Sequence, residues 1–231
     1  MIFRQLFDAE TSTYTYLVAD AATREAVLID PVLEQLERDL ELLRELELRL
    51  AYALDTHVHA DHVTAAGALR GRTGCKSVGG RGGADCTDLK LGHGDVLRVG
   101  ALALEALETP GHTDDSLTFL AEGCAFTGDA LMVRACGRTD FQNGDAGQLY
   151  DSIHAHLYTL PDDTRVYPGH DYKGRTVTTV GEEKRFNARL AGRTREQFVT
   201  LMNGLNLPRP KQLDVAVPAN RACGQPAPAQ G

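Results

Sequence analysis

A histidine motif at residues 56–62 holds the densest group of metal-binding side chains in the chain. Its sequence is Thr-His-Val-His-Ala-Asp-His, and its candidate ligands are His57, His59, Asp61 and His62. Three of the chain's eight histidines therefore fall within six positions. Imidazole and carboxylate groups are common ligands of zinc and iron in proteins. The motif predicts a metal site.

The elements around the histidine motif would place it at the edge of a sheet. Residues 50–54 are typical of a short buried strand, and residues 63–69 predict a helix. Sites in α/β folds lie at the carboxyl ends of strands. Because alternate side chains of an extended backbone share a face, we expect His57 and His59 to point into one cavity. The other two ligand candidates would follow as the helix opens.

Three further loops carry residues that can bind a metal. Each loop follows an apolar stretch, and each candidate comes directly after a glycine, which allows sharp turns and close backbone approach. These candidates are His112, Asp129 and His170. A single glycine-aspartate turn is weak evidence, but together with the histidine motif these loops predict a site whose ligands converge from four separate segments.

Hydrophobic periodicity predicts the remaining elements. We expect strands at residues 15–19, 26–29, 75–79, 96–99, 102–107, 116–120, 124–127 and 165–167. We expect helices at residues 33–48, 147–157, 182–190 and 194–202. Residues 1–223 would form one domain, and residues 224–231, rich in Pro, Ala and Gln, a disordered tail.

Composition limits the classes of function. The chain has 231 residues, 42% of them hydrophobic, and a formal net charge of -8. That acidity argues against a general nucleic-acid binder or a partner of anionic membranes, and no apolar run approaches the length of a membrane span. The five cysteines form an odd set without a C-x-x-C pair, and no signal peptide begins the chain. We therefore expect a cytoplasmic protein without a disulfide framework.

The order of these motifs resembles the metallo-β-lactamase superfamily. The segments that carry the resemblance are T-H-x-H-x-D-H, P-G-H-T, T-G-D and P-G-H. The resemblance implies an α/β fold of αββα type: two facing mixed β-sheets with helices on the outside and the metal at one edge. The superfamily includes thioester hydrolases, β-lactamases, nucleases and persulfide dioxygenases, so the fold alone leaves the chemistry open.

Two stretches are similar to the persulfide dioxygenases, the ethylmalonic encephalopathy protein family. They are residues 135–142 (Ala-Cys-Gly-Arg-Thr-Asp-Phe-Gln) and the chain ending at residues 205–210 and 214–220. The resemblance runs from residue 2 to Gly224, with one departure at Asp115, where a glycine is expected. It implies oxidation of glutathione persulfide by dioxygen and water to sulfite and glutathione.

Carried over to this sequence, the resemblance implies one Fe(II) per chain, held by His57, His112 and Asp129. Two imidazoles and one carboxylate leave open positions, as in non-haem iron oxygenases. Further motif residues would orient those ligands or bound water: His59, Asp61, His62 and His170. Because dinuclear relatives use the same residues as direct ligands, the sequence alone leaves the number of metals open.

Glutathione carries two carboxylates, so an acidic protein must hold it with local cations. Arg138 is the first candidate, because a guanidinium binds a carboxylate through two parallel hydrogen bonds. Tyr172 and Lys173, just beyond His170, are further candidates. The partners expected are therefore glutathione persulfide and dioxygen, and the sequence is compatible with a homo-oligomer.

Two other classes of function stay open. The first is a dinuclear zinc thioester hydrolase of glyoxalase II type, in which a bridging hydroxide attacks the substrate. The second is a non-catalytic metal-binding protein, which the full set of ligand candidates disfavours. Metal analysis separates the three classes. A dioxygenase should hold one iron per chain and a dinuclear hydrolase two metals, and a protein that takes up no metal would favour the non-catalytic class.

Overall fold

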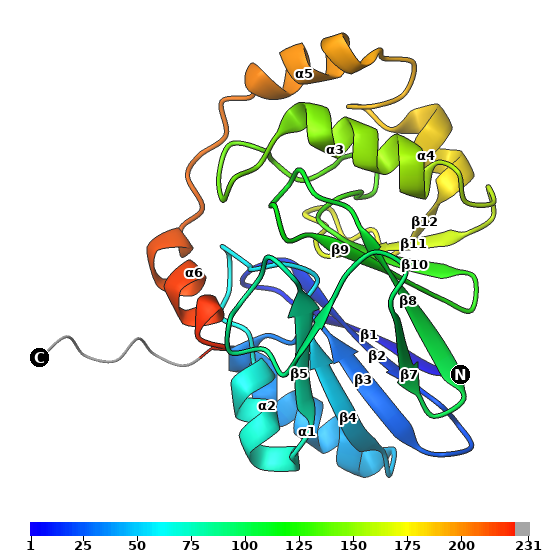
Figure 1. The fold of residues 1–231 in the computed structure, drawn as a ribbon, viewed down its shortest axis with the longest axis vertical. Coiled ribbons are helices and arrows are strands. Elements are labelled where there is room, and N and C mark those ends of the chain that lie inside the picture. Colours follow the sequence, from blue (N-terminus) through cyan, green and yellow to red (C-terminus); the bar gives the residue numbers. More distant parts are fainter. Residues whose placement is uncertain (225–231) are drawn as a thin grey trace, which may run out of the picture. The chain divides into compact units, whose positions relative to one another are not determined.

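The computed structural model describes residues 1–224 as two six-stranded mixed sheets with helices (Figure 1). The first sheet has the order β1-β2-β3-β4-β5-β6. Its strands are β1 (Ile2–Asp8), β2 (Thr13–Ala19), β3 (Glu25–Ile29), β4 (Arg49–Leu54), β5 (Lys76–Gly80) and β6 (Leu89–Leu91). Strands β1 to β3 pair antiparallel and β3 to β6 parallel. The parallel part brings the carboxyl ends of β3 and β4 to one edge.

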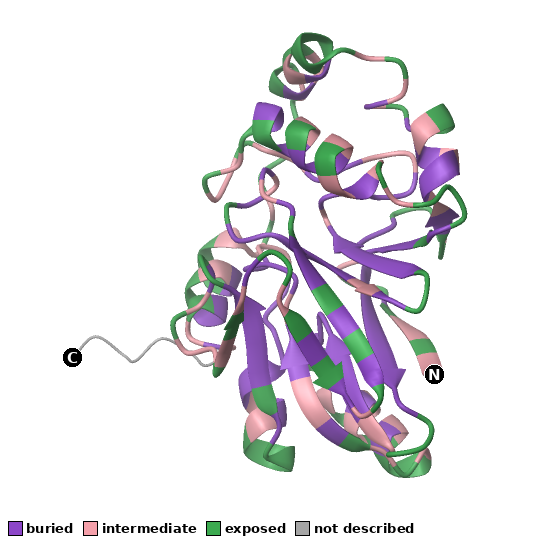
Figure 2. Cartoon of the chain, turned by 45° about the vertical axis from the view of Figure 1, so that its right-hand side comes forward, coloured by how far each residue is buried: buried purple, intermediate pink, exposed green. Residues whose placement is uncertain are grey.

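The second sheet has the order β12-β11-β10-β9-β8-β7. Its strands are β7 (Val96–Val99), β8 (Leu102–Glu108), β9 (Leu117–Ala121), β10 (Cys124–Gly128), β11 (Arg165–Pro168) and β12 (Thr178–Thr179). Strands β10 and β11 are parallel, so the loops after them leave the sheet at the same edge. Figure 2 shows how fully the central strands of the sheets are buried.

The helices follow or interrupt the strands. They are the short 3-10 helix η1 (Leu33–Gln35), α1 (Leu36–Glu45), α2 (Ala66–Thr73), α3 (Ala146–Ser152), the π-helical turn η2 (Ile153–Leu157), α4 (Val180–Phe186), α5 (Arg195–Asn203) and α6 (Leu213–Arg221). Among residues 1–224, no helix combines the length and the apolar content needed to span a bilayer.

The chain divides into two compact units. Unit 1 comprises Met1–Leu91, Leu97–Ala103 and the chain from Arg209 on, and unit 2 comprises Gly92–Val96 and Leu104–Pro208. Each unit has its own apolar core, and each carries part of the predicted metal-binding residues.

Helices α1 and α2 pack on the first sheet in unit 1. The three- and four-residue spacing of leucines in α1 turns one face inward, where Leu43 is buried. Leu69 of α2 and Leu28 of β3 belong to the same core, and both are fully buried. Burial of such a side chain contributes about 1.5–3 kcal/mol. This core fixes the strands that lead into the histidine motif.

Helices α3 and α5 form the core of unit 2 with the second sheet. Leu149 of α3 and Phe198 of α5 are fully buried with Val166 of β11. Helix α5 begins with a capping box, in which the Thr194 side chain and the Gln197 side chain each bond the other residue's backbone N–H. Such caps stabilise a helix start because its first N–H groups lack intrahelical partners.

The predicted elements are largely confirmed, with several differences. The helices expected at residues 33–48 and 182–190 end earlier, at Glu45 and Phe186. The helix expected at residues 63–69 begins only at Ala66, so Asp61 and His62 lie in the loop before it. Four elements were not predicted: β1, β6, β12 and α6. Cys86 and Cys223 form a disulfide with Cα atoms 5.9 Å apart, a bond that the expectation of a chain without a disulfide framework did not include. The predicted disordered tail lies, from residue 225, outside the described residues.

Candidate metal centre

In unit 1, the histidine motif is organised by a carboxylate at the end of the neighbouring strand. Asp30, the residue after β3, accepts hydrogen bonds from the backbone N–H of Thr56 at 2.7 Å and from the Thr56 hydroxyl at 3.0 Å. Asp30 is buried and has a left-handed backbone with φ of 52°. The carboxylate therefore fixes the first turn of the loop that follows β4.

These bonds determine which nitrogen of His57 carries the lone pair. The single hydroxyl proton of Thr56 is donated to Asp30, so the 3.0 Å contact between Thr56 Oγ1 and His57 Nδ1 requires Nδ1 to be the donor. A neutral imidazole that donates through Nδ1 has its lone pair on Nε2. His57 is buried, and Nε2 is the atom that it can offer to a metal.

His59 lies between His57 and His62, with ring centroids 4.1 and 4.3 Å away. Its Nε2 is 3.1 Å from Asp30 Oδ1. Burial disfavours the imidazolium form, but Asp30 above all, with Asp61 and Asp55, outweighs that effect and raises the pKa of His59 to about 9. Within residues 1–224, the buried Nδ1 of His59 has no hydrogen-bond partner, as expected of an atom that faces bound water.

Asp61 and His62 complete the motif. Asp61 Oδ2 lies 2.8 Å from His62 Nδ1 and accepts a hydrogen bond from the Thr13 hydroxyl at 3.1 Å. Ligand atoms of His59, Asp61 and His62 all lie within 4.8 Å of one another, a spacing that suits one cation. The four predicted residues of the motif are thus brought together.

In unit 2, His112 follows β8 in a loop that requires glycine. Gly111 has φ of 130°, and a Cβ there would lie 2.3 Å from the backbone nitrogen of Leu149, so α3 leaves no room for a side chain. His112 Nδ1 donates to the backbone carbonyl of Arg138 at 2.6 Å. The lone pair of His112 is therefore also on Nε2.

Asp129 follows β10, and its carboxylate faces two histidines. Its Oδ1 accepts a hydrogen bond from His170 Nδ1 at 2.7 Å, and its Oδ2 lies 3.6 Å from His112 Nε2. Because the proton of the His112 ring is on Nδ1, its Nε2 has a lone pair. The second contact therefore places this lone pair close to the carboxylate oxygen Oδ2 of Asp129. A cation between them removes the repulsion, so this pair fits a metal.

Gly137 lets the segment at residues 135–142 approach these ligands. Its N–H donates to the backbone carbonyl of Asp129 at 2.6 Å. A Cβ at Gly137 would lie 2.6 Å from His112 Nδ1 and 2.5 Å from that carbonyl. The segment that resembles the persulfide dioxygenases therefore packs directly against His112 and Asp129.

The predicted substrate-binding residues have different surroundings. The guanidinium of Arg138 is bound to both carboxylate oxygens of Asp140, at 2.7 and 2.8 Å, and to the Pro208 carbonyl at 2.7 Å. Tyr172 is 72% exposed and stacks on His170 with ring centroids 6.0 Å apart. Lys173 is exposed beside it. Arg138 thus already has a carboxylate partner, which the sequence did not indicate.

Two residues that order the motif, Asp30 and Thr56, were not predicted from the sequence. Asp30 directly follows the strand predicted at residues 26–29, and an acidic residue directly after a parallel strand is itself a signal of a site. Thr56 was included in the motif without a role. The departure at Asp115 is tolerated: it is buried, and the loop is closed by hydrogen bonds between Thr113 and Ser116.

Comparison with known proteins identifies the family. The model of the metallo-beta-lactamase superfamily matches residues 9–85 and 87–170. Persulfide dioxygenase ETHE1, mitochondrial, from Mus musculus is 51% identical over 231 residues, which cover 99% of this chain and 91% of the mouse protein. The crystal structure of ETHE1 from Myxococcus xanthus is 64% identical with a TM-score of 0.97, over 97% of this chain and 100% of that chain.

A hydroxyacylglutathione hydrolase from Bradyrhizobium sp. is more distant, with 35% identity over 83% of this chain and 76% of its own length. The mouse protein's name carries the word mitochondrial, which does not match the cytoplasmic location expected from composition. The metallo-β-lactamase fold predicted from the motifs is confirmed. The chain belongs to the metallo-β-lactamase superfamily and, within it, to the persulfide dioxygenases.

Proposed function

We propose that the protein oxidises glutathione persulfide with dioxygen and water, giving glutathione, sulfite and two protons. The outer sulfur of the persulfide loses four electrons, and dioxygen accepts them. One observation carries the proposal: the segment typical of persulfide dioxygenases holds His112 through the Arg138 carbonyl and holds Asp129 through the Gly137 N–H. The segment that is typical of the family thus directly contacts two of the proposed metal ligands, His112 and Asp129.

One Fe(II) per chain is the proposed metal, with His57 Nε2, His112 Nε2 and Asp129 Oδ2 as its ligands. The tautomers of both histidines support this choice, because each donates through Nδ1 and has its lone pair on Nε2. Iron in such a site supplies the one-electron chemistry that dioxygen requires and that zinc lacks. The role of the chain is to hold three ligands and leave the other positions to substrates.

His59, Asp61, His62 and His170 are proposed to orient ligands and water rather than to hold a second metal. His170 Nδ1 donates to the carboxylate oxygen of Asp129 opposite the proposed ligand atom, which fixes that carboxylate. Asp61 bonds both His62 and Thr13, and Asp30 engages His59. A dinuclear hydrolase would use several of these residues as direct ligands, whereas the proposal gives them hydrogen-bonding roles around a single metal.

Glutathione is proposed to bind through Arg138, Tyr172 and Lys173. Lys173 and Tyr172 are exposed next to His170, so an anionic ligand reaches them without desolvating a buried charge. Arg138 holds Asp140, and a substrate carboxylate would share that guanidinium or replace Asp140 on it. The cytoplasmic location, the single domain and the option of a homo-oligomer stay predictions.

The test measures metal content together with dioxygen uptake. Protein reconstituted anaerobically with Fe(II) should hold one iron per chain and consume dioxygen when glutathione persulfide is added. Zinc-loaded protein is the matched control and should consume none. Thioester hydrolysis by the zinc form, with no persulfide oxidation by the iron form, would establish the glyoxalase II alternative instead.

A further inference from the structure

A residue near the chain end, Asn220 of α6, bonds the backbone of the histidine motif. Its Nδ2 donates to the carbonyls of His59 at 2.9 Å and His62 at 2.8 Å, and its Oδ1 accepts from the N–H of Thr64 at 2.8 Å. Asn220 is buried, with 4% of its surface exposed. One side chain thus fixes the backbone on both sides of His62.

An amide side chain matches these three backbone groups in a way that few residues can. Its two N–H groups satisfy two carbonyls, and its oxygen satisfies one N–H. Buried backbone groups left without a partner are costly, so the loop conformation between His59 and Thr64 depends on the amide. The remote origin of the contact, 156 residues from Thr64, makes it a tertiary constraint rather than a local turn.

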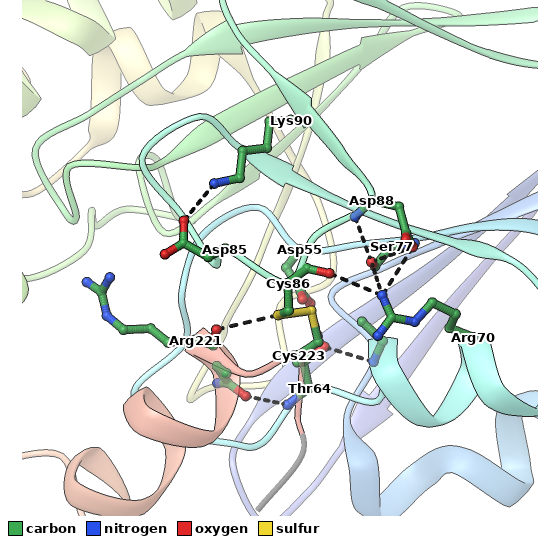
Figure 3. The surroundings of a disulfide bond; sticks show 12 residues. Asp55, Thr64, Arg70, Ser77, Asp85, Cys86, Asp88, Lys90, Arg221 and Cys223 are labelled. Atoms are coloured by element: carbon green, nitrogen blue, oxygen red, sulfur yellow. Dashed lines mark hydrogen bonds and ion pairs between the residues drawn. A yellow bond between two sulfur atoms is a disulfide. The ribbon is translucent and has the colours of Figure 1, made fainter. Parts of the chain in front are cut away.

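A disulfide bond and a backbone hydrogen bond hold the end of helix α6 next to this contact. Figure 3 shows the Cys86–Cys223 disulfide beside Thr64, where α6 has just ended. The carbonyl of Cys223 accepts a hydrogen bond from Gly67 N–H of α2 at 3.0 Å. A Cβ on Gly67 would lie 2.3 Å from that carbonyl oxygen, so only glycine permits the approach. Covalent and backbone contacts together hold Asn220 in register with the loop.

We infer that Asn220 is a positioning residue for the metal centre: it sets the backbone of the histidine motif so that the imidazoles of His59 and His62 lie where they orient the ligands and bound water. This inference rests on the proposed metal centre. Asn220 touches neither metal nor substrate, and it acts through the carbonyls of His59 and His62. Its removal would change metal affinity and ligand arrangement, whereas a merely structural residue would change stability alone.

The test titrates wild type, Asn220→Ala and Asn220→Asp with Co(II), whose visible absorption reports the number and arrangement of its ligands. Asn220→Ala removes all three bonds, and Asn220→Asp keeps the size and the acceptor but turns the donor into an acceptor facing two carbonyls. For both variants we expect the Co(II) dissociation constant to rise about 10- to 100-fold and the absorption bands to change.

Ser77→Ala is the matched control. Ser77 is buried in β5 of the same unit, and its hydroxyl donates to Asp88 Oδ2 at 2.8 Å and accepts from Asp88 N–H and from Arg70. Three hydrogen bonds are lost there as well, but none involves the histidine motif. Ser77→Ala should lower the melting temperature of the metal-free protein while its Co(II) affinity and spectrum stay those of wild type.

Folding of each variant is checked by circular dichroism, and Asn220→Asp, which keeps the side-chain size, decides the test if Asn220→Ala does not fold. Asn220 variants that lose stability but titrate like wild type, as Ser77→Ala should, overturn the positioning role. Failure of wild type itself to bind Co(II) or Fe(II) is a different result: it removes the proposed metal centre, and the inference with it.

Discussion

His112 Nδ1 donates a 2.6 Å hydrogen bond to the backbone carbonyl of Arg138. The bond joins a predicted metal ligand to the segment that distinguishes persulfide dioxygenases from other members of the superfamily. A backbone carbonyl is an acceptor in every protonation state, so it fixes the histidine tautomer permanently. The segment typical of the family therefore orients a candidate metal ligand through its backbone, and the Arg138 side chain is not involved.

The first prediction tests the close packing at Gly137. Gly137→Ala places a Cβ 2.6 Å from the His112 ring, so either the ring or the segment must move. We expect iron affinity to fall by about 10- to 100-fold, with dioxygen uptake reduced to match. Iron content after dialysis and an oxygen electrode measure the two effects.

Gly71→Ala controls for the added methyl group. Gly71 lies in α2, where a Cβ would meet no atom within 4 Å. Alanine is the better helix former, so this variant should gain about 0.5–1 kcal/mol of stability and keep wild-type iron affinity. Equal iron affinity in the Gly137 variant would show that the His112 ring tolerates displacement.

The second prediction addresses the number of metals. Asp61→Asn should still bind one iron per chain but turn over about 10–100-fold more slowly, because in the proposed mononuclear site Asp61 bonds His62 and does not ligate the metal. His112→Ala should lose tight iron binding, since only two of the three proposed ligands remain. Metal analysis of all three proteins after the same reconstitution decides: two metals in wild type and one in Asp61→Asn would contradict a mononuclear site.

The third prediction separates recognition from internal structure at Arg138. Arg138→Gln should raise KM for glutathione persulfide about tenfold or more while iron content stays normal, as expected for loss of a charged hydrogen bond. Asp140→Asn is the matched control, because it breaks the same internal ion pair but keeps the cation. A KM that rises equally in both variants would assign the arginine to loop structure.

The fourth prediction concerns acid stability. Hydrogen bonds from the N–H groups of Ala101 and Ala22, and then from Thr23, lower the pKa of Asp20 from 3.8 to about 2. The folded-state pKa lies below the unfolded one, so this carboxylate stabilises the fold above about pH 4, and the stabilisation disappears as pH falls through about 2. The difference in melting temperature between wild type and Asp20→Asn should therefore shrink below about pH 4.

The control for that pH dependence is Asp163→Asn, which removes the same charge at an exposed position of unit 2. Its melting temperature should follow that of wild type across the same range. A wild-type advantage over Asp20→Asn that stays constant down to about pH 2 would mean that the Asp20 carboxylate does not hold the 20–25 turn to Ala101 through its charge.

The fifth prediction concerns the disulfide. Cys86 and Cys223 lie 137 positions apart, so their bond restricts the unfolded chain strongly. Cys86→Ser combined with Cys223→Ser should lower the free energy of unfolding by about 2–4 kcal/mol in urea titrations. Wild type treated with a phosphine reductant should then unfold at the urea concentration of the double variant. Coincident curves for the untreated proteins would show that the bond contributes no stability.

Sequence patterns predicted that the candidate ligands lie in loops directly after strands, because residue type and strand pattern are both local features. Glycines before His112, Asp129 and His170 and the apolar stretches before them are visible in a single sequence. The partners of the motif are not. Asp30 meets Thr56 across 26 residues and Asn220 meets Thr64 across 156, and only the folded chain reveals such pairings.

The elements that were not predicted share a physical reason. Strand β1 is mostly half-buried and lacks a regular alternation, and β12 has only two residues. Helix α6 has Pro218 in its interior, which argues against a helix in any local reading. The start of α2 is delayed because the backbone at Thr64 is bonded to Asn220 instead of to a helix. Tertiary contacts decide each of these cases.

The Cys86–Cys223 bond closes a covalent ring that contains every residue of unit 2, because Gly92–Val96 and Leu104–Pro208 both lie between the two cysteines in sequence. A single protease cut anywhere in unit 2 opens the ring without releasing a fragment. Nicked protein would therefore migrate as one species under denaturing conditions and separate into two pieces only after reduction.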